Sequence, residues 1–89
     1  MRLTQKTTDI NGLKAIYVEA GEGKEIFFFI PGWGANPDAY EDLLLLLASK
    51  YKVISPYPPG FGKTYTPKKV WTSEKYGEFF INFLEKLSL

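Results

Sequence analysis

The sequence predicts an α/β fold with about four strands: an N-terminal hairpin, then parallel strands and two helices. Asn11-Gly12 separates two β-prone segments, which indicates a tight hairpin turn. Two apolar runs, EIFFFI and YKVISPY, enclose a helical segment, and this order has the length of a right-handed crossover between parallel strands. A last segment carries apolar residues at helical spacing, as a helix that covers a sheet does.

The composition allows one small domain, residues 1–89, with no repeat or linker. A net charge of +1 provides no field for nucleic acid or an anionic membrane, and no apolar run is long enough to span a bilayer. Cysteine and histidine are both absent, so a Ser-His-Asp triad cannot form within this chain and zinc lacks its usual ligands. We therefore expect a cytoplasmic chain with no cofactor and no metal.

The first half of the chain reads as three strands and a helix. Residues 2–10 and 13–20 form the expected hairpin, and Pro31 and Gly32 end a run that resembles a strand buried on both faces. Asn36 is a suitable helix cap, and the helix is expected to run to about Lys50. Pro37 suits the first turn of this helix. The acidic residues near its start complement the positive end of the helix dipole: Asp38, Glu41 and Asp42. This role explains the pair Glu41-Asp42 better than acid/base chemistry does.

This helix is apolar almost all round. Its expected sheet-facing stripe comprises Tyr40, Leu43, Leu44 and Leu47. Leu45, Leu46 and Ala48 lie outside that stripe and are apolar as well. A helix of this kind is usually buried on more than one side, so we expect something further to cover it. The alternative is a leucine-rich helix with some exposure.

The last part of the chain is expected to be irregular over residues 58–71 and helical from Thr72 to Leu87. The buried stripe of that helix is predicted to contain Tyr76, Phe79, Phe80, Phe83, Leu84 and Leu87. Trp71 and Phe61 are candidates for lining a cleft beside the glycine-rich loop, although packing is the better account of single aromatic residues near a helix start.

The stretch YPPGFGKT, residues 57–64, ends like a phosphate-binding loop. Gly62, Lys63 and Thr64 fit the last three places of that motif. Tyr57 stands where the first glycine belongs, and the two prolines after it remove backbone N–H donors. Nucleotide binding through Lys63 is therefore disfavoured.

The order hairpin, IFFFIPGWG, helix, YKVISPYPPGFGKT, helix resembles the N-terminal half of the α/β-hydrolase fold. In that family a strand ends in a His-Gly-X-Gly motif, and the next strand runs into an acidic-x-Pro-Gly-x-Gly-x-Ser loop. The resemblance covers all of the chain but only the first half of the family's domain. It implies that Trp33, between Gly32 and Gly34, gives its backbone N–H to an oxyanion hole. The alternative is that the two glycines only make a turn.

The chain departs from the family's motifs in three places. Pro31 replaces the histidine, Tyr57 or Pro58 replaces the acid, and Thr64 replaces the serine. The chain also ends where the family would begin the strand leading to its nucleophile, so nucleophile, acid and histidine are all expected outside it. The serines lie in none of the required contexts: Ser49, Ser55, Ser73 and Ser88.

The missing strand would leave an apolar edge bare, and such an edge invites pairing. We expect contact through the strand at Glu25–Ile30 and the helix at Leu43–Leu47, either with a second copy of this chain or with a separate chain carrying the C-terminal half. Two functions remain open: part of an esterase-like hydrolase that is inactive alone, or a non-catalytic homo-oligomeric binding or assembly module.

Overall fold

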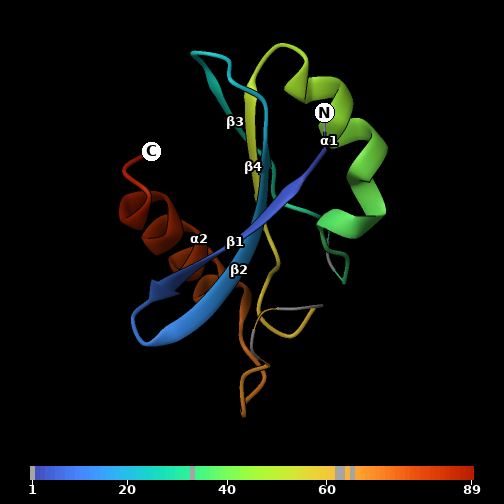
Figure 1. The fold of residues 1–89 in the computed structure, drawn as a ribbon. Helices are drawn as coiled ribbons and strands as arrows, with labels where there is room; N and C mark the ends of the chain where they lie inside the picture. Colours follow the sequence, from blue (N-terminus) through green and yellow to red (C-terminus); the bar gives the residue numbers. More distant parts are fainter. Residues whose placement is uncertain (1, 33, 62–63, 65) are drawn as a thin grey trace.

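A four-stranded mixed sheet forms the centre of the computed structural model, which describes residues 2–32, 34–61, 64 and 66–89. The strands follow the order β1-β2-β4-β3 (Figure 1). Their bounds are β1 Thr4–Ile10, β2 Leu13–Ala20, β3 Ile26–Phe28 and β4 Lys52–Pro56. β2 pairs antiparallel with β1 and with β4, whereas β3 and β4 are parallel. The predicted α/β class is confirmed.

The hairpin between β1 and β2 has the predicted turn. Asn11 and Gly12 both adopt positive φ angles, 51° and 87°, as the tight turn favoured by a right-twisted hairpin requires. The Asp9 carboxylate accepts a hydrogen bond of 2.8 Å from the Gly12 N–H. Ile10 and Leu13 are consequently directly opposite each other in the register.

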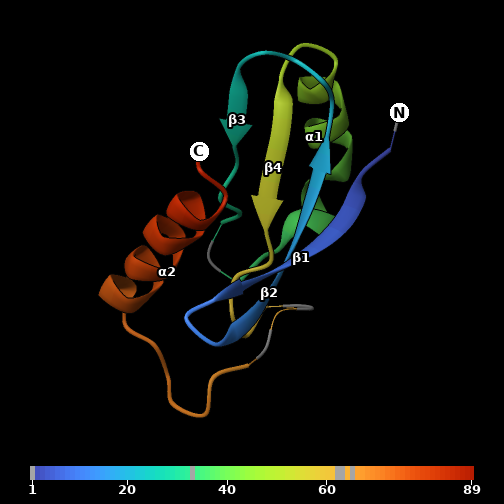
Figure 2. The ribbon, with the colours of Figure 1, turned by 60° about the vertical axis from the view of Figure 1, so that its left-hand side comes forward.

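The two helical segments lie on opposite faces of the sheet (Figure 2). A 3₁₀ turn, η1 (Pro37–Tyr40), leads into α1 (Glu41–Ala48), and α2 is Ser73–Lys86. Caps fix both starts: the Asn36 side chain accepts from the Asp38 N–H at 3.0 Å, and the Thr72 hydroxyl accepts from the Lys75 N–H at 3.1 Å. Among the described residues, neither helix has the length and apolarity that crossing a bilayer requires.

The sheet separates two apolar cores. The core under α2 contains Ile10, Ala15, Tyr17, Ile54, Phe79 and Phe83. The core under α1 contains Val18, Ala20, Leu44, Ala48, Val53 and Tyr57. Alternate residues of β2 and β4 therefore serve opposite faces, as the two-residue period of a strand dictates.

The predicted sheet-facing stripe of α1 needs correction. Leu43 is 42% exposed, whereas Leu44 and Ala48 are buried. The buried side of α1 is therefore centred on Leu44 and Ala48, and Leu43 lies outside it. Leu46 is 71% exposed and lies on the side of α1 that faces solvent.

Strand β3 is shorter and more exposed than the sequence predicted. Only Ile26–Phe28 is strand, and Ile26, Phe27 and Ile30 are 45%, 37% and 48% exposed. β3 lies at the edge of the sheet, and within the described part of the chain it pairs only with β4. The expectation of burial on both faces is therefore wrong for this strand, and among the described residues no further strand covers its outer edge.

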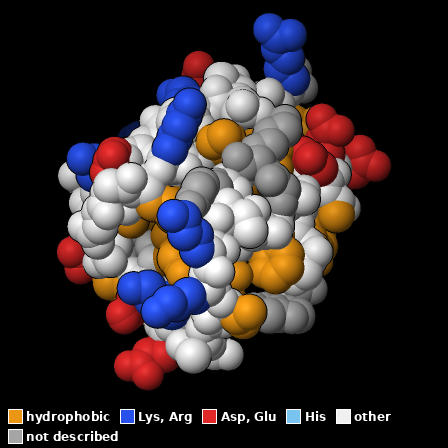
Figure 3. Space-filling view, turned by 90° about the horizontal axis from the view of Figure 1, so that it is seen from below, with side chains coloured by type: hydrophobic (Ala, Val, Ile, Leu, Met, Phe, Trp, Pro, Cys, Tyr) orange, Lys and Arg blue, Asp and Glu red, His pale blue; other side chains and the backbone are white. Residues whose placement is uncertain are grey.

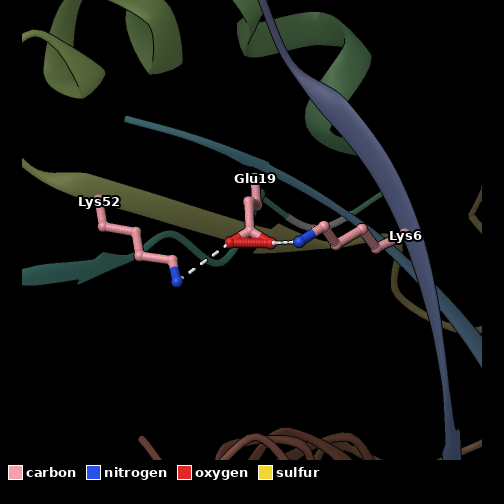
Figure 4. A network of polar contacts seen from close by, with 3 residues as sticks. All are labelled: Lys6, Glu19 and Lys52. Carbon is pink, nitrogen blue, oxygen red and sulfur yellow. Dashed lines mark ion pairs between the residues drawn. The ribbon is translucent and has the colours of Figure 1, made fainter. Parts of the chain in front are cut away.

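An ion network joins three strands at the corner of the sheet where β4 begins. Glu19 on β2 lies between Lys6 on β1 and Lys52 on β4, with N–O distances of 2.5 Å and 3.3 Å (Figure 4). Burial acts to raise the pKa of the Glu19 carboxyl, but the hydrogen bonds and charges of the two lysines outweigh it and lower the pKa. The ionised carboxylate therefore stabilises the folded state.

Replacing Glu19 with glutamine is expected to lower the free energy of unfolding by about 0.5–1 kcal/mol at neutral pH. Because the folded pKa lies below the unfolded one, this stabilisation is present above the unfolded pKa and is lost as pH falls through the folded pKa. Urea unfolding at neutral pH and in acid should show a difference from wild type that disappears in acid. The exposed Glu22→Gln is the control, and an equal loss in both variants would contradict the assignment.

Candidate functional site

Two loops meet at one end of the sheet because β3 and β4 are parallel. Residues 29–36 follow β3 and residues 57–72 follow β4, so both begin at the carboxyl ends of their strands. Ligands of open α/β sheets bind at such an end. Figure 3 looks onto this side of the molecule and shows hydrophobic side chains gathered between charged ones.

The loop after β3 contains the predicted oxyanion segment. Gly34 has a φ of +79°, which favours glycine, and a Cβ built there would meet nothing within 4 Å. The Ala35 N–H donates to the Gly32 carbonyl at 2.9 Å, which closes a tight turn. Trp33 lies outside the described residues, so its backbone donor role stays a prediction. The structure does place both flanking glycines beside a pocket.

That pocket is small and apolar, with a volume of about 110 Å³. Its walls are formed by Ile30, Pro31, Gly32, Gly34, Pro58, Phe61, Tyr76 and Phe80. The Tyr76 hydroxyl donates to the Pro59 carbonyl at 2.8 Å, and burial raises the pKa of this phenol. Among the described lining residues, none carries a charge, and such walls strengthen electrostatic interactions by excluding water.

The two candidate aromatic residues have different roles. Phe61 lines the pocket and stacks on Tyr76 with ring centroids 6.1 Å apart. Trp71 does not line it: its ring packs edge-on against Tyr76 at 5.1 Å and tilts against Phe79 at 6.1 Å. Packing is therefore the correct account of Trp71 at this site.

Thr64, in the place of the family's serine, fastens the second loop to the sheet. It is 2% exposed, and its hydroxyl accepts from the Ile16 N–H at 3.0 Å and donates to the Ile16 carbonyl at 3.3 Å. Gly62 and Lys63 of the phosphate-loop hypothesis lie outside the described residues. Pro58 and Pro59, which argue against that hypothesis, are buried.

Tyr57, one of the two residues in the place of the family's acid, connects the second loop to η1. Its side chain is buried, and its hydroxyl donates to the Asp38 carboxylate in η1 at 2.6 Å. Burial, followed by this bond and the charge of Asp38, raises the pKa of Tyr57, so the phenol stays a neutral donor. The sequence predicts for Asp38 only a favourable interaction with the helix dipole, and no local pattern indicates this contact.

The four serines have structural environments. The Ser49 hydroxyl donates to the Leu46 carbonyl at 2.7 Å, and the Ser55 hydroxyl to the Phe29 carbonyl at 2.8 Å. Ser73 is the first residue of α2, and Ser88 follows its last turn with a φ of +58°. The chain has no histidine, so none of these serines can belong to a Ser-His-Asp triad formed within these 89 residues.

Comparison with known proteins gives the same fold, although no protein-family model matches the chain. The uncharacterized hydrolase YNR064C of Saccharomyces cerevisiae is 36% identical over 59 residues, which make up 65% of this chain and 20% of the yeast protein. Among solved structures, a membrane phospholipase A is 25% identical with a TM-score of 0.87 over 96% of this chain. The Cif epoxide hydrolase of Acinetobacter nosocomialis is 27% identical with a TM-score of 0.83 over 96% of this chain.

The matched length shows how much of each solved structure this chain spans. The chain spans 28% of the phospholipase A and 27% of the Cif epoxide hydrolase. The hairpin, the mixed sheet order, the two strand-end loops and the two covering helices are all in place. This chain has the α/β-hydrolase fold, of which it forms the N-terminal portion.

Proposed function

We propose that this chain supplies the scaffold and one oxyanion-hole donor of an esterase-like serine hydrolase. The donor is the backbone N–H of Trp33, between Gly32 and Gly34. The observation that carries the proposal is the position of the two glycines: they line an apolar pocket at the carboxyl ends of two parallel strands. In α/β hydrolases one oxyanion donor comes from the loop at this position.

The chemistry needs a backbone donor that is already aimed when charge develops. Attack on an ester carbonyl places negative charge on its oxygen, and a fixed N–H in a dry site stabilises that charge with little reorganisation. A main-chain donor is indifferent to its side chain, so a tryptophan is acceptable at this place. Glycines on both sides give the loop the backbone freedom to turn an N–H inward.

The remainder of the catalytic machinery must come from outside these 89 residues. Nucleophile, acid and histidine would be contributed by the C-terminal portion of the fold, on a separate chain or elsewhere in a longer protein. The exposed β3 residues Ile26 and Phe27 support contact through Glu25–Ile30, and exposed Leu43 and Leu46 support contact through Leu43–Leu47. A cytoplasmic location stays a prediction.

The same exposed edge favours one alternative, a non-catalytic homo-oligomeric binding or assembly module. A second copy could add its β3 to this one across a two-fold axis. Light scattering and an ester-hydrolysis assay together distinguish the hydrolase part from the module. A stable homodimer, with no hydrolysis even when the C-terminal portion of the fold is supplied, would favour the module.

The hydrolase proposal is tested by a chimera in which this chain replaces the matched segment of the phospholipase A. With p-nitrophenyl butyrate as substrate, the chimera is expected to turn over and the lone chain to match buffer. The absence of histidine from the chain is the reason for the second result. A folded but inactive chimera would contradict the proposal, as would turnover by the lone chain that is lost on a Ser→Ala change.

A further inference from the structure

Tyr57 joins three separate parts of the chain at the pocket end of the sheet. It directly follows β4, and its N–H donates to the Ile16 carbonyl of β2 at 2.8 Å. Its hydroxyl reaches Asp38, which lies 19 residues earlier, in η1. At 1% exposure the phenol ring is fully enclosed, so its hydroxyl has a fixed direction.

Asp38 receives this bond in a position that is itself held. The Asp38 N–H is bound by the Asn36 side chain at 3.0 Å, and the Ala39 N–H donates to the Asn36 carbonyl at 3.1 Å. A hydrogen bond of 2.6 Å to a carboxylate belongs to the charge-assisted class, which is about twice as strong as neutral bonds. The contact therefore fastens η1 to the end of β4.

The position of η1 determines where the glycine turn can lie. Tyr40 ends η1, and a Cβ built at Gly32 would lie 3.1 Å from the Tyr40 hydroxyl, so the turn passes directly beside that side chain. The Tyr40 ring also packs edge-on against Phe29, with centroids 4.9 Å apart. If η1 moved, Tyr40 would move with it and would disturb its contacts with Phe29 and with Gly32.

We propose that Tyr57 and Asp38 are positioning residues that hold η1, and through Tyr40 the Gly32–Gly34 turn, against the carboxyl end of β4. Their catalytic consequence rests on the function proposed above, because the held turn carries the oxyanion donor. Where the family resemblance places an acid, this chain has Tyr57 or Pro58, and the carboxylate that Tyr57 binds comes from η1.

Amide hydrogen exchange of the chain, followed by NMR, tests the contact without any need for activity. Tyr57→Phe removes only the hydroxyl and is expected to speed exchange at Ala35 and Ala39 about tenfold, while sheet amides of β2 keep their rates. Asp38→Ala should match it, and the double variant should add little, since both changes break one bond. Asp38→Asn retains an acceptor oxygen and should stay close to wild type.

Tyr51→Phe is the matched control, because it removes a tyrosine hydroxyl at the opposite end of β4. Unchanged exchange at Ala35 and Ala39 in Tyr57→Phe would overturn the proposal. Equal acceleration throughout the sheet would also overturn it, since that would show only global destabilisation.

The catalytic consequence is read in the chimera, where Tyr57→Phe should lower kcat about tenfold and leave KM nearly unchanged. Faster exchange with an unchanged kcat would contradict the positioning role in catalysis. If the chimera with Tyr57 intact is folded but inactive, the proposed function fails, and the exchange rates alone decide whether the pair positions the turn.

Discussion

Replacing Phe83 with alanine is expected to lower the free energy of unfolding by about 3–5 kcal/mol. Phe83 is 0% exposed and lies between α2 and the sheet. Its ring centroid is 5.2 Å from that of Tyr17 on β2 and 5.6 Å from that of Phe28 on β3. Truncation leaves a cavity where these rings meet, and a chain of this length has only about 4–13 kcal/mol of stability in total.

Urea unfolding followed by circular dichroism measures this loss. Ile81→Ala is the control, since Ile81 is on the same helix but is 57% exposed, and its stability should change by less than about 0.5 kcal/mol. Similar stabilities for the two variants would show that α2 does not depend on Phe83 for its docking.

Local signals in the sequence were sufficient for most of the fold. The Asn11-Gly12 turn and the cap at Asn36 are where the sequence predicted them, because each depends on residues within three positions. The last helix was expected from Thr72, and it begins at Ser73 with Thr72 as its cap. The parallel pairing of β3 with β4 followed from the length of the crossover between them. The assignment of Gly32 and Gly34 to an oxyanion site rests on the order of motifs and stays a prediction.

Contacts between distant residues could not be predicted in this way. The bonds from Tyr57 to Asp38 and from Thr64 to Ile16 join residues 19 and 48 positions apart, and no periodicity signals either one. The exposure of β3 also differed from expectation: an apolar run indicates a strand that can be buried, but it does not say whether a neighbouring strand covers it. Leu43 was misplaced because a helix that is apolar on nearly every side does not indicate which side faces the sheet.

Replacing Trp33 with proline in the chimera is expected to lower kcat about 10²–10³-fold. Proline has no backbone N–H, so the substitution removes the proposed oxyanion donor itself. KM should change much less, because the lost interaction forms only as charge develops in the transition state. Trp33→Phe keeps the N–H and should lose far less activity, which separates the main-chain role from that of the indole.

The kcat of Trp33→Pro, compared with that of Trp33→Phe in the same folded chimera, tests most directly whether this chain contributes to ester hydrolysis. A loss of two to three orders of magnitude in the proline variant alone is the predicted result. Equal kcat values in the two variants would contradict an oxyanion donor at this turn and leave the chain a role in scaffolding only.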